Sequence, residues 1–485
     1  MQPEISSLSS GVPALDTILH GGYIVGRLYL IRGHPGTGKT LAGMHFLEEG
    51  IQQGETVLFI HGEESETEIL ANAAQFDIDL SDANFLDLGP ESEFFTESKS
   101  HDLVDPSDVD RDQHTESIYN AIAEINPSRV VIDPITQIRY VEANEYEFRK
   151  RILAFMRFLK GRETTVLATT TPSQNQEFDV EMQSLADGVI EMERGEGGRR
   201  VEITKHRGYG QAEGDHGLEI RSQGLEVYPA LIPEQRDRSF DPERISSGID
   251  GLDTLVGGGI ESGTVTIVSG PTGVGKTTTG SLFLTEAAQN GTTATLYLFE
   301  ESEETFTYRL DALGMPITEL REQGTLQVRE VEPLSLSAEE FAEMVRSDVE
   351  ENGTELVMID GIDGYTMSLQ GTEEGLVRKL HSLTRVLKNR GVSVFVTDEI
   401  STITGLTSAT SSNISYIADN ILFLSYMEVD GELHKVIGTL KKRAGDFEQT
   451  LREFDISQAG IFVGEPLSGV SGILDGSPHF TSPAE

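Results

Sequence analysis

The chain alternates between short, continuously apolar runs and longer segments in which apolar residues recur at helical spacing. RLYLIRG at 27–33 precedes LAGMHFLEEGIQQ at 41–53, and similar runs follow as TVLFIHG, RVVIDP and TTVLATT. A continuously apolar run of this length is typical of a strand buried on both faces, whereas spacing at i, i+3 and i+4 indicates an amphipathic helix. The alternation predicts an α/β fold in which mostly parallel sheets are flanked by helices.

The same succession appears twice along the chain. SSGVPALDTILHGGYIVGRLYLIRG in the first half corresponds to SSGIDGLDTLVGGGIESGTVTIVSG in the second. Three pairs of identical residues stand the same 237 positions apart, namely Asp16 and Asp253, Lys39 and Lys276, and Glu63 and Glu300. Such a constant offset indicates a duplicated unit. The proline-bearing, charged segment between the halves is typical of a linker, so we expect domains at 1–232 and 233–485, with a flexible tail from about 464.

The amino-acid composition restricts the kinds of site the protein can contain and the environment in which it works. The chain has no cysteine, which excludes disulfides and thiolate metal sites, and its net charge is −44 with a pI near 4.5. We interpret this charge as that of a protein from a salt-loving host, with an acidic mesophilic protein as the alternative. An acidic surface disfavours nucleic acid as a partner. No long apolar run or signal peptide is evident, so we expect a cytoplasmic protein without a membrane span.

Two segments fit the phosphate-loop pattern G-x-x-x-x-G-K-[ST] without a mismatch. Each stands between a predicted strand and a predicted helix, where backbone N–H groups can hold phosphates. The pattern predicts ATP and Mg²⁺ as ligands, with the two lysines on the β- and γ-phosphates and the final threonines on the metal. The predicted nucleotide-binding residues are Gly33, His34, Pro35, Gly36, Thr37, Gly38, Lys39 and Thr40, and Gly270, Pro271, Thr272, Gly273, Val274, Gly275, Lys276 and Thr277.

Carboxylates follow the other predicted strands of each half. Asp133 ends RVVIDP and Asp360 ends LVMIDG, which suits them to the Mg²⁺ shell beside Thr40 and Thr277. The pairs Glu63-Glu64 and Glu300-Glu301 follow the next strand-like runs, and we interpret them as catalytic groups that order or deprotonate the attacking water. The alternative for these pairs is a solvated acidic face.

Cations stand at matching places near the end of each half. Lys205 and Arg207 lie in TKHRGYG, and Lys441 and Arg443 lie in LKKRAGD. A cation offered to the γ-phosphate of a neighbouring subunit stabilises charge in the transition state. We therefore predict that these four residues act in trans on the γ-phosphate, with a surface hairpin as the alternative.

These motifs together resemble the KaiC family of circadian-clock ATPases and its archaeal relatives, within the RecA superfamily. The resemblance covers nearly the whole chain and is carried by G-x-x-x-LD…GG before each phosphate loop, by Glu-Glu-Ser at Glu63–Ser65 and Glu300–Ser302, and by the two Lys-x-Arg motifs. It implies two tandem RecA-like domains and a homohexameric double ring with ATP between subunits. It also implies protein partners, for which the C-terminal tail is a candidate site.

The resemblance further implies a division of labour, with slow ATP hydrolysis in domain 1 and autophosphorylation in domain 2. The family's Ser-Thr acceptor pair matches Ser415-Tyr416 in ISYIAD, so Ser415 is the candidate acceptor and Tyr416 departs from the pattern. Two other functions stay open. One is a RecA-type DNA-dependent ATPase, which DNA-stimulated turnover would favour, and the other is a scaffold that uses nucleotide only to assemble.

Overall fold

The computed structural model divides the chain into two compact units, Met1–Ala230 and Leu231–Glu485, referred to below as domain 1 and domain 2. The predicted boundary at 232/233 lies two residues beyond this division. The residues described are 6–480 apart from 89–118, 121, 137–151, 153, 156, 160, 173–175, 196, 209, 232–242, 405–408, 412–413, 430, 458–459 and 477.

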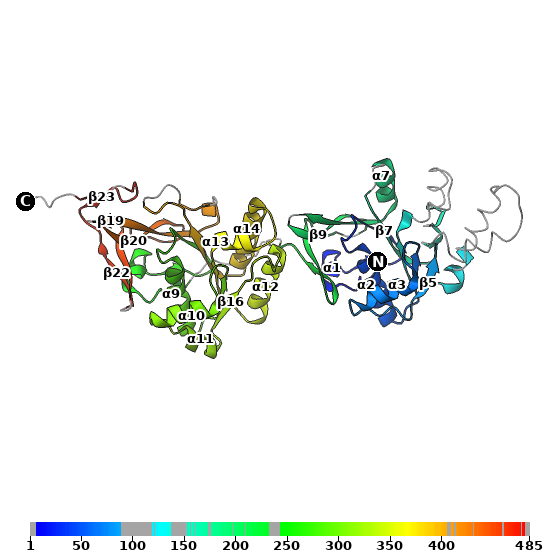
Figure 1. Cartoon of the computed structure of the whole chain (residues 1–485), viewed down its shortest axis with the longest axis horizontal. Coiled ribbons are helices and arrows are strands. Elements are labelled where there is room, and N and C mark those ends of the chain that lie inside the picture. Colours follow the sequence, from blue (N-terminus) through cyan, green and yellow to red (C-terminus); the bar gives the residue numbers. More distant parts are fainter. Residues whose placement is uncertain are drawn as a thin grey trace, which may run out of the picture. The chain divides into compact units, whose positions relative to one another are not determined.

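Domain 1 is built on a nine-stranded sheet in the order β11-β10-β9-β8-β3-β7-β6-β4-β5. Figure 1 labels three of these strands, β5, β7 and β9. The strands from β5 to β8 are parallel and those from β8 to β11 are antiparallel. The strands are β3 (Leu28–Gly33), β4 (Val57–His61), β5 (Asn84–Asp87), β6 (Arg129–Asp133), β7 (Thr165–Thr170), β8 (Gly188–Gly195), β9 (Gly198–His206), β10 (His216–Arg221) and β11 (Gly224–Tyr228), with a separate pair β1 (Ser7–Leu8) and β2 (Tyr23–Ile24). Helices include α1 (Pro13–Ile18), α2 (Lys39–Gln52), α3 (Glu66–Ala74) and α7 (Gln176–Leu185).

Domain 2 repeats this topology with the order β16-β15-β17-β18-β14-β19-β20-β21-β22. Its strands are β14 (Val265–Gly270), β15 (Ala294–Leu298), β16 (Leu326–Glu330), β17 (Leu356–Asp360), β18 (Ser393–Glu399), β19 (Asn420–Val429), β20 (Glu432–Lys442), β21 (Arg452–Ser457) and β22 (Gly460–Pro466), with the short pairs β12 (Arg244–Ile245) and β13 (Ile260–Glu261), and β23 (Val470–Ser471) and β24 (His479–Phe480). Its helices are α8 (Asp250–Leu255), α9 (Lys276–Gln289), α10 (Glu303–Ala312), α11 (Ile317–Gln323), α12 (Ala338–Glu351), α13 (Ile362–Ser368) and α14 (Glu373–Asn389), with the 3₁₀ turn η3 (Ile414–Tyr416).

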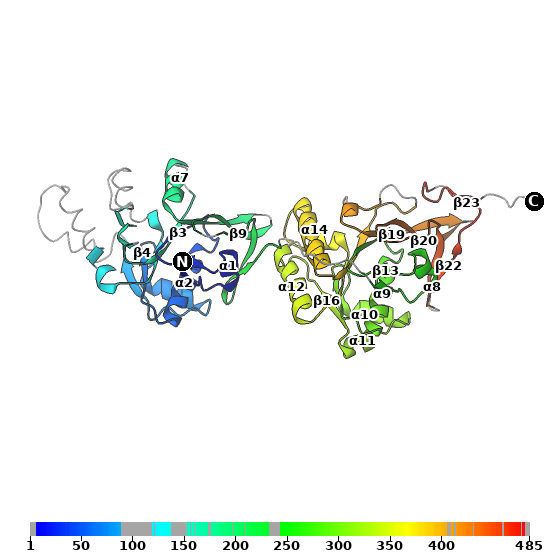
Figure 2. The same ribbon diagram turned by 180° about the vertical axis from the view of Figure 1, so that it is seen from behind.

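The continuous apolar runs arise because each central strand is covered on both faces. In β14, Val268 joins a core cluster with residues of α9 and α10, whereas its neighbour Ile267 joins a second cluster with residues of α12, α13 and α14. Helices α12 and α14 lie side by side in Figure 2. This confirms the predicted fold class, two tandem RecA-like domains that each have a mostly parallel sheet flanked by helices. None of the described helices is both long enough and apolar enough to cross a bilayer.

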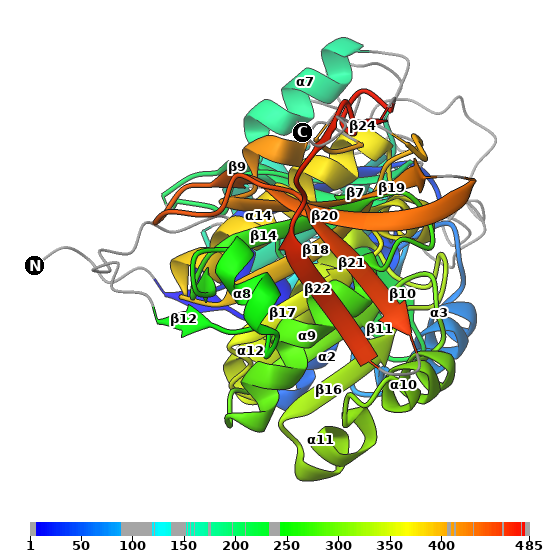
Figure 3. The same cartoon turned by 90° about the vertical axis from the view of Figure 1, so that its left-hand side faces the viewer.

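Antiparallel strands at one edge of the sheet pack close to the phosphate loop. In domain 2, β21 and β22 lie side by side (Figure 3), and Ile456 of β21 would lie 2.5 Å from a Cβ placed on Gly275. Gly275 has a φ of +114°, a backbone conformation that residues other than glycine adopt only at a cost in free energy. Glycine at this point of the loop therefore serves both the turn and the approach of β21.

Secondary structure continues into the C-terminal segment, for which the sequence predicts a flexible tail. Strand β22 continues to Pro466, and Ile473 is buried beside Met427 and Val436 of the antiparallel strands. The short pair β23 and β24 extends this order to Phe480. These short elements have no periodic signal in the sequence, because their apolar residues are isolated among Gly, Ser and Pro, and the flexibility of the tail stays a prediction.

Candidate nucleotide sites

Both phosphate loops join a central strand of the sheet to the N-terminus of a long helix. The loop of domain 1 leads from β3 into α2, and that of domain 2 leads from β14 into α9. In each, the lysine side chain folds back onto the loop, so that Lys39 donates to the carbonyl of His34 at 3.0 Å and Lys276 to that of Pro271 at 3.1 Å. The helix N-terminus and the lysine present positive charge at one place, which suits a phosphate group.

A cavity of about 750 Å³ opens beside the loop of domain 2. Its lining includes the charged residues Lys276, Glu300, Asp360 and Glu399, and Tyr308, Leu313 and Ile456 add apolar surface. The remaining lining residues are Thr272, Gly273, Gly275, Thr277, Thr278, Thr305, Arg309, Ala312, Gly361, Thr397 and Lys435. A cavity with a charged part and an apolar part has the chemistry that a nucleotide requires.

Thr277 and Asp360 meet in this cavity. Thr277 Oγ1 donates to the two carboxylate oxygens of Asp360 at 2.9 and 3.1 Å, and Thr397 Oγ1 donates to Asp360 Oδ1 at 2.8 Å. Asp360 is only 6% exposed, and burial raises its pKa from 3.8 to about 6. Hydroxyl and carboxylate oxygens are the ligands that Mg²⁺ prefers, so this pair fits the metal predicted from the sequence.

The two glutamates that follow β15 have different surroundings. Burial raises the pKa of Glu300, although the backbone N–H of Gly364 donates to its carboxylate at 3.3 Å. Glu301 instead forms an ion pair with Arg309 of α10, with Nη2 to Oε2 at 2.7 Å. Glu300 therefore faces the cavity that contains Lys276, and Glu301 is tied to the helix beside it.

Domain 1 has a much smaller cavity of about 50 Å³, and the loop lysine Lys39 is not among the residues that line it. Thr40, Glu63, Glu64 and Asp133 all line it. Thr169 Oγ1 donates to Asp133 as Thr397 does to Asp360, and Asn72 Nδ2 donates to Glu64 Oε2 at 3.1 Å, in the role of Arg309. Burial lowers the pKa of Lys39, while the nearby charges of Asp133 and Glu63 raise it. The donor set that fits Mg²⁺ is thus the same in both domains.

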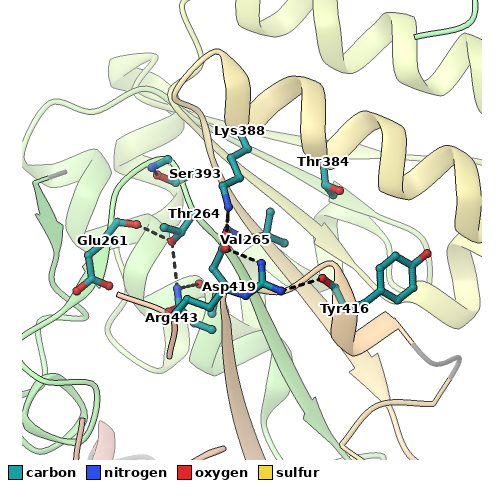
Figure 4. A network of polar contacts seen from close by, with 12 residues as sticks. Glu261, Thr264, Val265, Thr384, Lys388, Ser393, Tyr416, Asp419 and Arg443 are labelled. Carbon is teal, nitrogen blue, oxygen red and sulfur yellow. Dashed lines mark hydrogen bonds and ion pairs between the residues drawn. The ribbon is translucent and has the colours of Figure 1, made fainter. Parts of the chain in front are cut away.

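The two Lys-x-Arg motifs are not among the residues that line either cavity in the described part of the chain. In domain 2, Lys441 Nζ donates to the carbonyl of Ser415 at 2.7 Å and Arg443 Nη2 to that of Tyr416 at 3.3 Å. Figure 4 shows Arg443 and Lys388 pointing toward the buried Asp419, with contacts of 3.3 Å and 2.6 Å. Asp419 also accepts from the backbone N–H of Val265 at 3.0 Å, which fixes it to the start of β14.

The corresponding cations of domain 1 have the same kind of partners. Lys205 Nζ donates to the carbonyls of Gln183 and Ser184, and Arg207 Nη2 donates to that of Ser184 at 3.3 Å. Asp187 takes the place of Asp419 and pairs with Arg27 at 3.1 Å. In both domains the cations are therefore held beside the segment that precedes the last parallel strand.

Sequence reasoning missed several residues of these sites. Glu399 ends β18 and lies 3.3 Å from Lys276. The sequence of this strand, SVFVTDE, shows the same pattern of an apolar run followed by a carboxylate that identified Asp360. Arg309 and Asn72 gave no such signal, because a polar residue eight positions after a glutamate is common on any exposed helix. Their role depends on how the helix packs.

Comparison with known proteins agrees with this architecture. A family model described as "ATPase: KaiC" matches the chain twice, at residues 8–232 and 245–468. The chain is 29% identical over 492 residues to the "Circadian clock oscillator protein KaiC" of Acaryochloris marina, which covers 98% of this chain and 92% of that protein. The protein of the same name from a Picosynechococcus species is 30% identical over 488 residues, with the same coverage. The chain therefore belongs to the KaiC family of ATPases and carries the family's domain twice.

Proposed function

We propose that the chain is an ATP-binding and ATP-hydrolysing signalling protein with two nucleotide sites. The observation that carries the proposal is that each domain gathers a phosphate-loop lysine and threonine, a strand-end aspartate and a glutamate at one edge of its sheet. Membership of a family of ATPases also supports the proposal that the chain binds and hydrolyses ATP. The large cavity of domain 2 has the mixed charged and apolar lining that a whole nucleotide needs.

The reaction proposed is transfer of the γ-phosphoryl group of ATP to water. Lys276 and the loop N–H groups offset the phosphate charge, and Thr277 and Asp360 would hold Mg²⁺, which neutralises charge on the phosphate oxygens. Glu300, whose pKa burial raises, accepts the proton of the attacking water as the bond to the leaving ADP breaks. Lys39, Thr40, Asp133 and Glu63 act in the same roles in domain 1.

The remaining cations act between subunits in this proposal. Lys441 and Arg443 are held away from their own chain's cavity by carbonyl groups, and Arg443 is 52% exposed. In a homohexamer they, and Lys205 and Arg207 in domain 1, would approach the γ-phosphate of the neighbouring chain.

Autophosphorylation on Ser415 is the second activity proposed for domain 2. Ser415 lies in the turn η3, whose carbonyl groups bind Lys441 and Arg443. The acceptor hydroxyl and the cations therefore belong to one locally connected group, so a subunit contact that presents one would also present the other. Tyr416 beside it packs against His381, with ring centroids 5.1 Å apart.

The experiment that tests this proposal follows the γ-phosphate. Purified protein is incubated with γ-labelled ATP and Mg²⁺ in molar KCl, beside Lys39→Ala, Lys276→Ala, the double variant and Ser415→Ala. We expect free phosphate from the wild type, less from each single variant and none from the double variant. Label on the protein should disappear in Ser415→Ala. Undiminished turnover in the double variant would refute the assigned sites, and turnover that requires added DNA would favour the DNA-dependent alternative.

A further inference from the structure

A carboxylate in contact with the loop lysine is one difference between the two phosphate sites. Glu399 Oε2 lies 3.3 Å from Lys276 Nζ, and both residues line the cavity of domain 2. Lys276 is 11% exposed and Glu399 is 38% exposed, so the ammonium group is largely buried while the carboxylate remains accessible to solvent. In both domains the loop lysine donates to a carbonyl group of the loop. The position in domain 1 that corresponds to Glu399, however, carries no charge.

The sheet register identifies that matched position. Strand β18 pairs with β14 so that Glu399 stands opposite Gly270, the first glycine of the loop. In domain 1 the pairing of β7 with β3 brings Thr170 opposite Arg32, and Thr171 follows where Glu399 stands in domain 2. Thr169 and Thr397 confirm this alignment, because each donates to the strand-end aspartate of its own domain.

Glu399 therefore adds a negative charge to the lining of the cavity of domain 2. Its neighbour Asp398 also matches a threonine, Thr170, but Asp398 hydrogen-bonds to Ser411 and is not among the residues that line this cavity. Glu63 and Asp133 in domain 1 correspond to Glu300 and Asp360 in domain 2, and the charge of Glu399 contributes to the raised pKa of Glu300. A phosphate that binds Lys276 either displaces Glu399 or shares the three N–H donors of the ammonium group with it, and in both cases the carboxylate stays close to the phosphate. The carboxylate then lies beside a polyanion, which is unfavourable unless a cation lies between them.

We propose that Glu399 is a specificity-determining residue that makes domain 2 select magnesium-complexed nucleotide over metal-free nucleotide more strongly than domain 1 does. The inference rests on the proposed nucleotide sites and adds what distinguishes them. Mg²⁺ offsets the repulsion between Glu399 and the phosphates, whereas Thr171 creates no such repulsion in domain 1. Domain 2 is consequently the weaker site when Mg²⁺ is scarce.

The test measures nucleotide affinity of each site in the full-length chain. Fluorescent ATP is titrated into each protein in two buffers, one that contains Mg²⁺ and one that contains EDTA. Lys39→Ala protein reports on domain 2, and Lys276→Ala protein reports on domain 1. Glu399→Thr and the near-isosteric Glu399→Gln are added to the first background, and the reciprocal Thr171→Glu to the second. Thermal unfolding checks that every variant is folded.

We expect both Glu399 variants to tighten metal-free binding in domain 2 by roughly three- to tenfold, with a smaller change when Mg²⁺ is present. Thr171→Glu should weaken metal-free binding in domain 1 by a similar factor. Equal affinities of the Glu399 variants and their parent, with and without Mg²⁺, would overturn the inference and leave the proposed function intact. Absence of binding to both parent proteins would instead count against the proposed sites themselves.

Discussion

At the scale of single residues, the buried carboxylate of Asp360 connects the chemistry of the site to the stability of the fold. Asp360 lies at the end of β17 and accepts hydrogen bonds from Thr277 and Thr397, yet burial still raises its pKa to about 6. The two hydroxyl donors thus only partly compensate for lost hydration. A divalent cation at the same place would restore the balance, which is why a metal-binding carboxylate is costly when no metal is bound.

Replacing Asp360 by Asn should stabilise the protein in the absence of nucleotide and Mg²⁺. Folding raises the pKa of Asp360, so the folded state is relatively more stable at a pH below 3.8, the pKa of the carboxyl group in the unfolded chain. This stability is lost as the pH rises from 3.8 through about 6, where the buried carboxyl group becomes charged. Asp360→Asn should therefore raise the free energy of unfolding by roughly 1–3 kcal/mol at pH 8, and by less at pH 5. Urea unfolding at the two pH values measures the effect. A gain of equal size at both would show that the charge of Asp360 is not its source.

At the scale of elements, the first glycine of each loop determines how closely two strands approach. A Cβ on Gly33 would lie 2.3 Å from the carbonyl oxygen of Met192, and one on Gly270 would lie 2.7 Å from that of Leu424. Both contacts are with backbone of the neighbouring parallel strand, which cannot move aside as a side chain can. The close pairing of β3 with β8 therefore requires glycine at the first position of the loop.

Gly33→Ala should accordingly destabilise domain 1 more than an ordinary glycine substitution does. Gly54→Ala is the matched control, because Gly54 has a φ of +73° but open space around it. We expect a cost of about 1 kcal/mol for Gly54→Ala, from backbone strain alone, and roughly 2–4 kcal/mol for Gly33→Ala. Thermal and urea unfolding of the full chain give both values, and equal costs would show that the strands can separate without penalty.

The sequence was sufficient for the fold class, and several of the residues that it proposes for the sites lie together in the structure, such as Thr277, Glu300 and Asp360. Apolar runs identified the parallel strands because they are buried on both faces, and strand-end carboxylates such as Asp133 and Asp360 follow from the same pattern. The antiparallel packing of Ile456 over the loop, the order around Ile473 and the partners of Arg443 were not predictable. Each depends on contacts between segments distant in sequence, which leave no local periodicity.

At the scale of the whole molecule, the dominant property is its charge. Lysine and arginine number 37 against 81 aspartate and glutamate residues, for a net charge of −44. Like charges at this density oppose compaction, and the opposition weakens as the Debye length falls from about 10 Å at 0.1 M salt to about 3 Å at 1 M.

The midpoint of thermal unfolding should consequently rise when KCl is increased from 0.1 M to 1 M. Both domains contribute acidic surface, so the increase should appear in every unfolding transition that calorimetry resolves. Sucrose at matched osmolality is the control, since it favours compact states without screening charge. A midpoint that falls with KCl, or that sucrose raises equally, would contradict an electrostatic origin.

We propose that one chain contains two separate nucleotide sites, one for each copy of the repeated domain. The most direct measurement is the number of ATP molecules bound per chain, by equilibrium titration with Mg²⁺, in the wild type, Lys39→Ala, Lys276→Ala and the double variant. We expect two, one, one and none. Two molecules bound to either single variant, or one bound to the wild type, would contradict the presence of two separate sites.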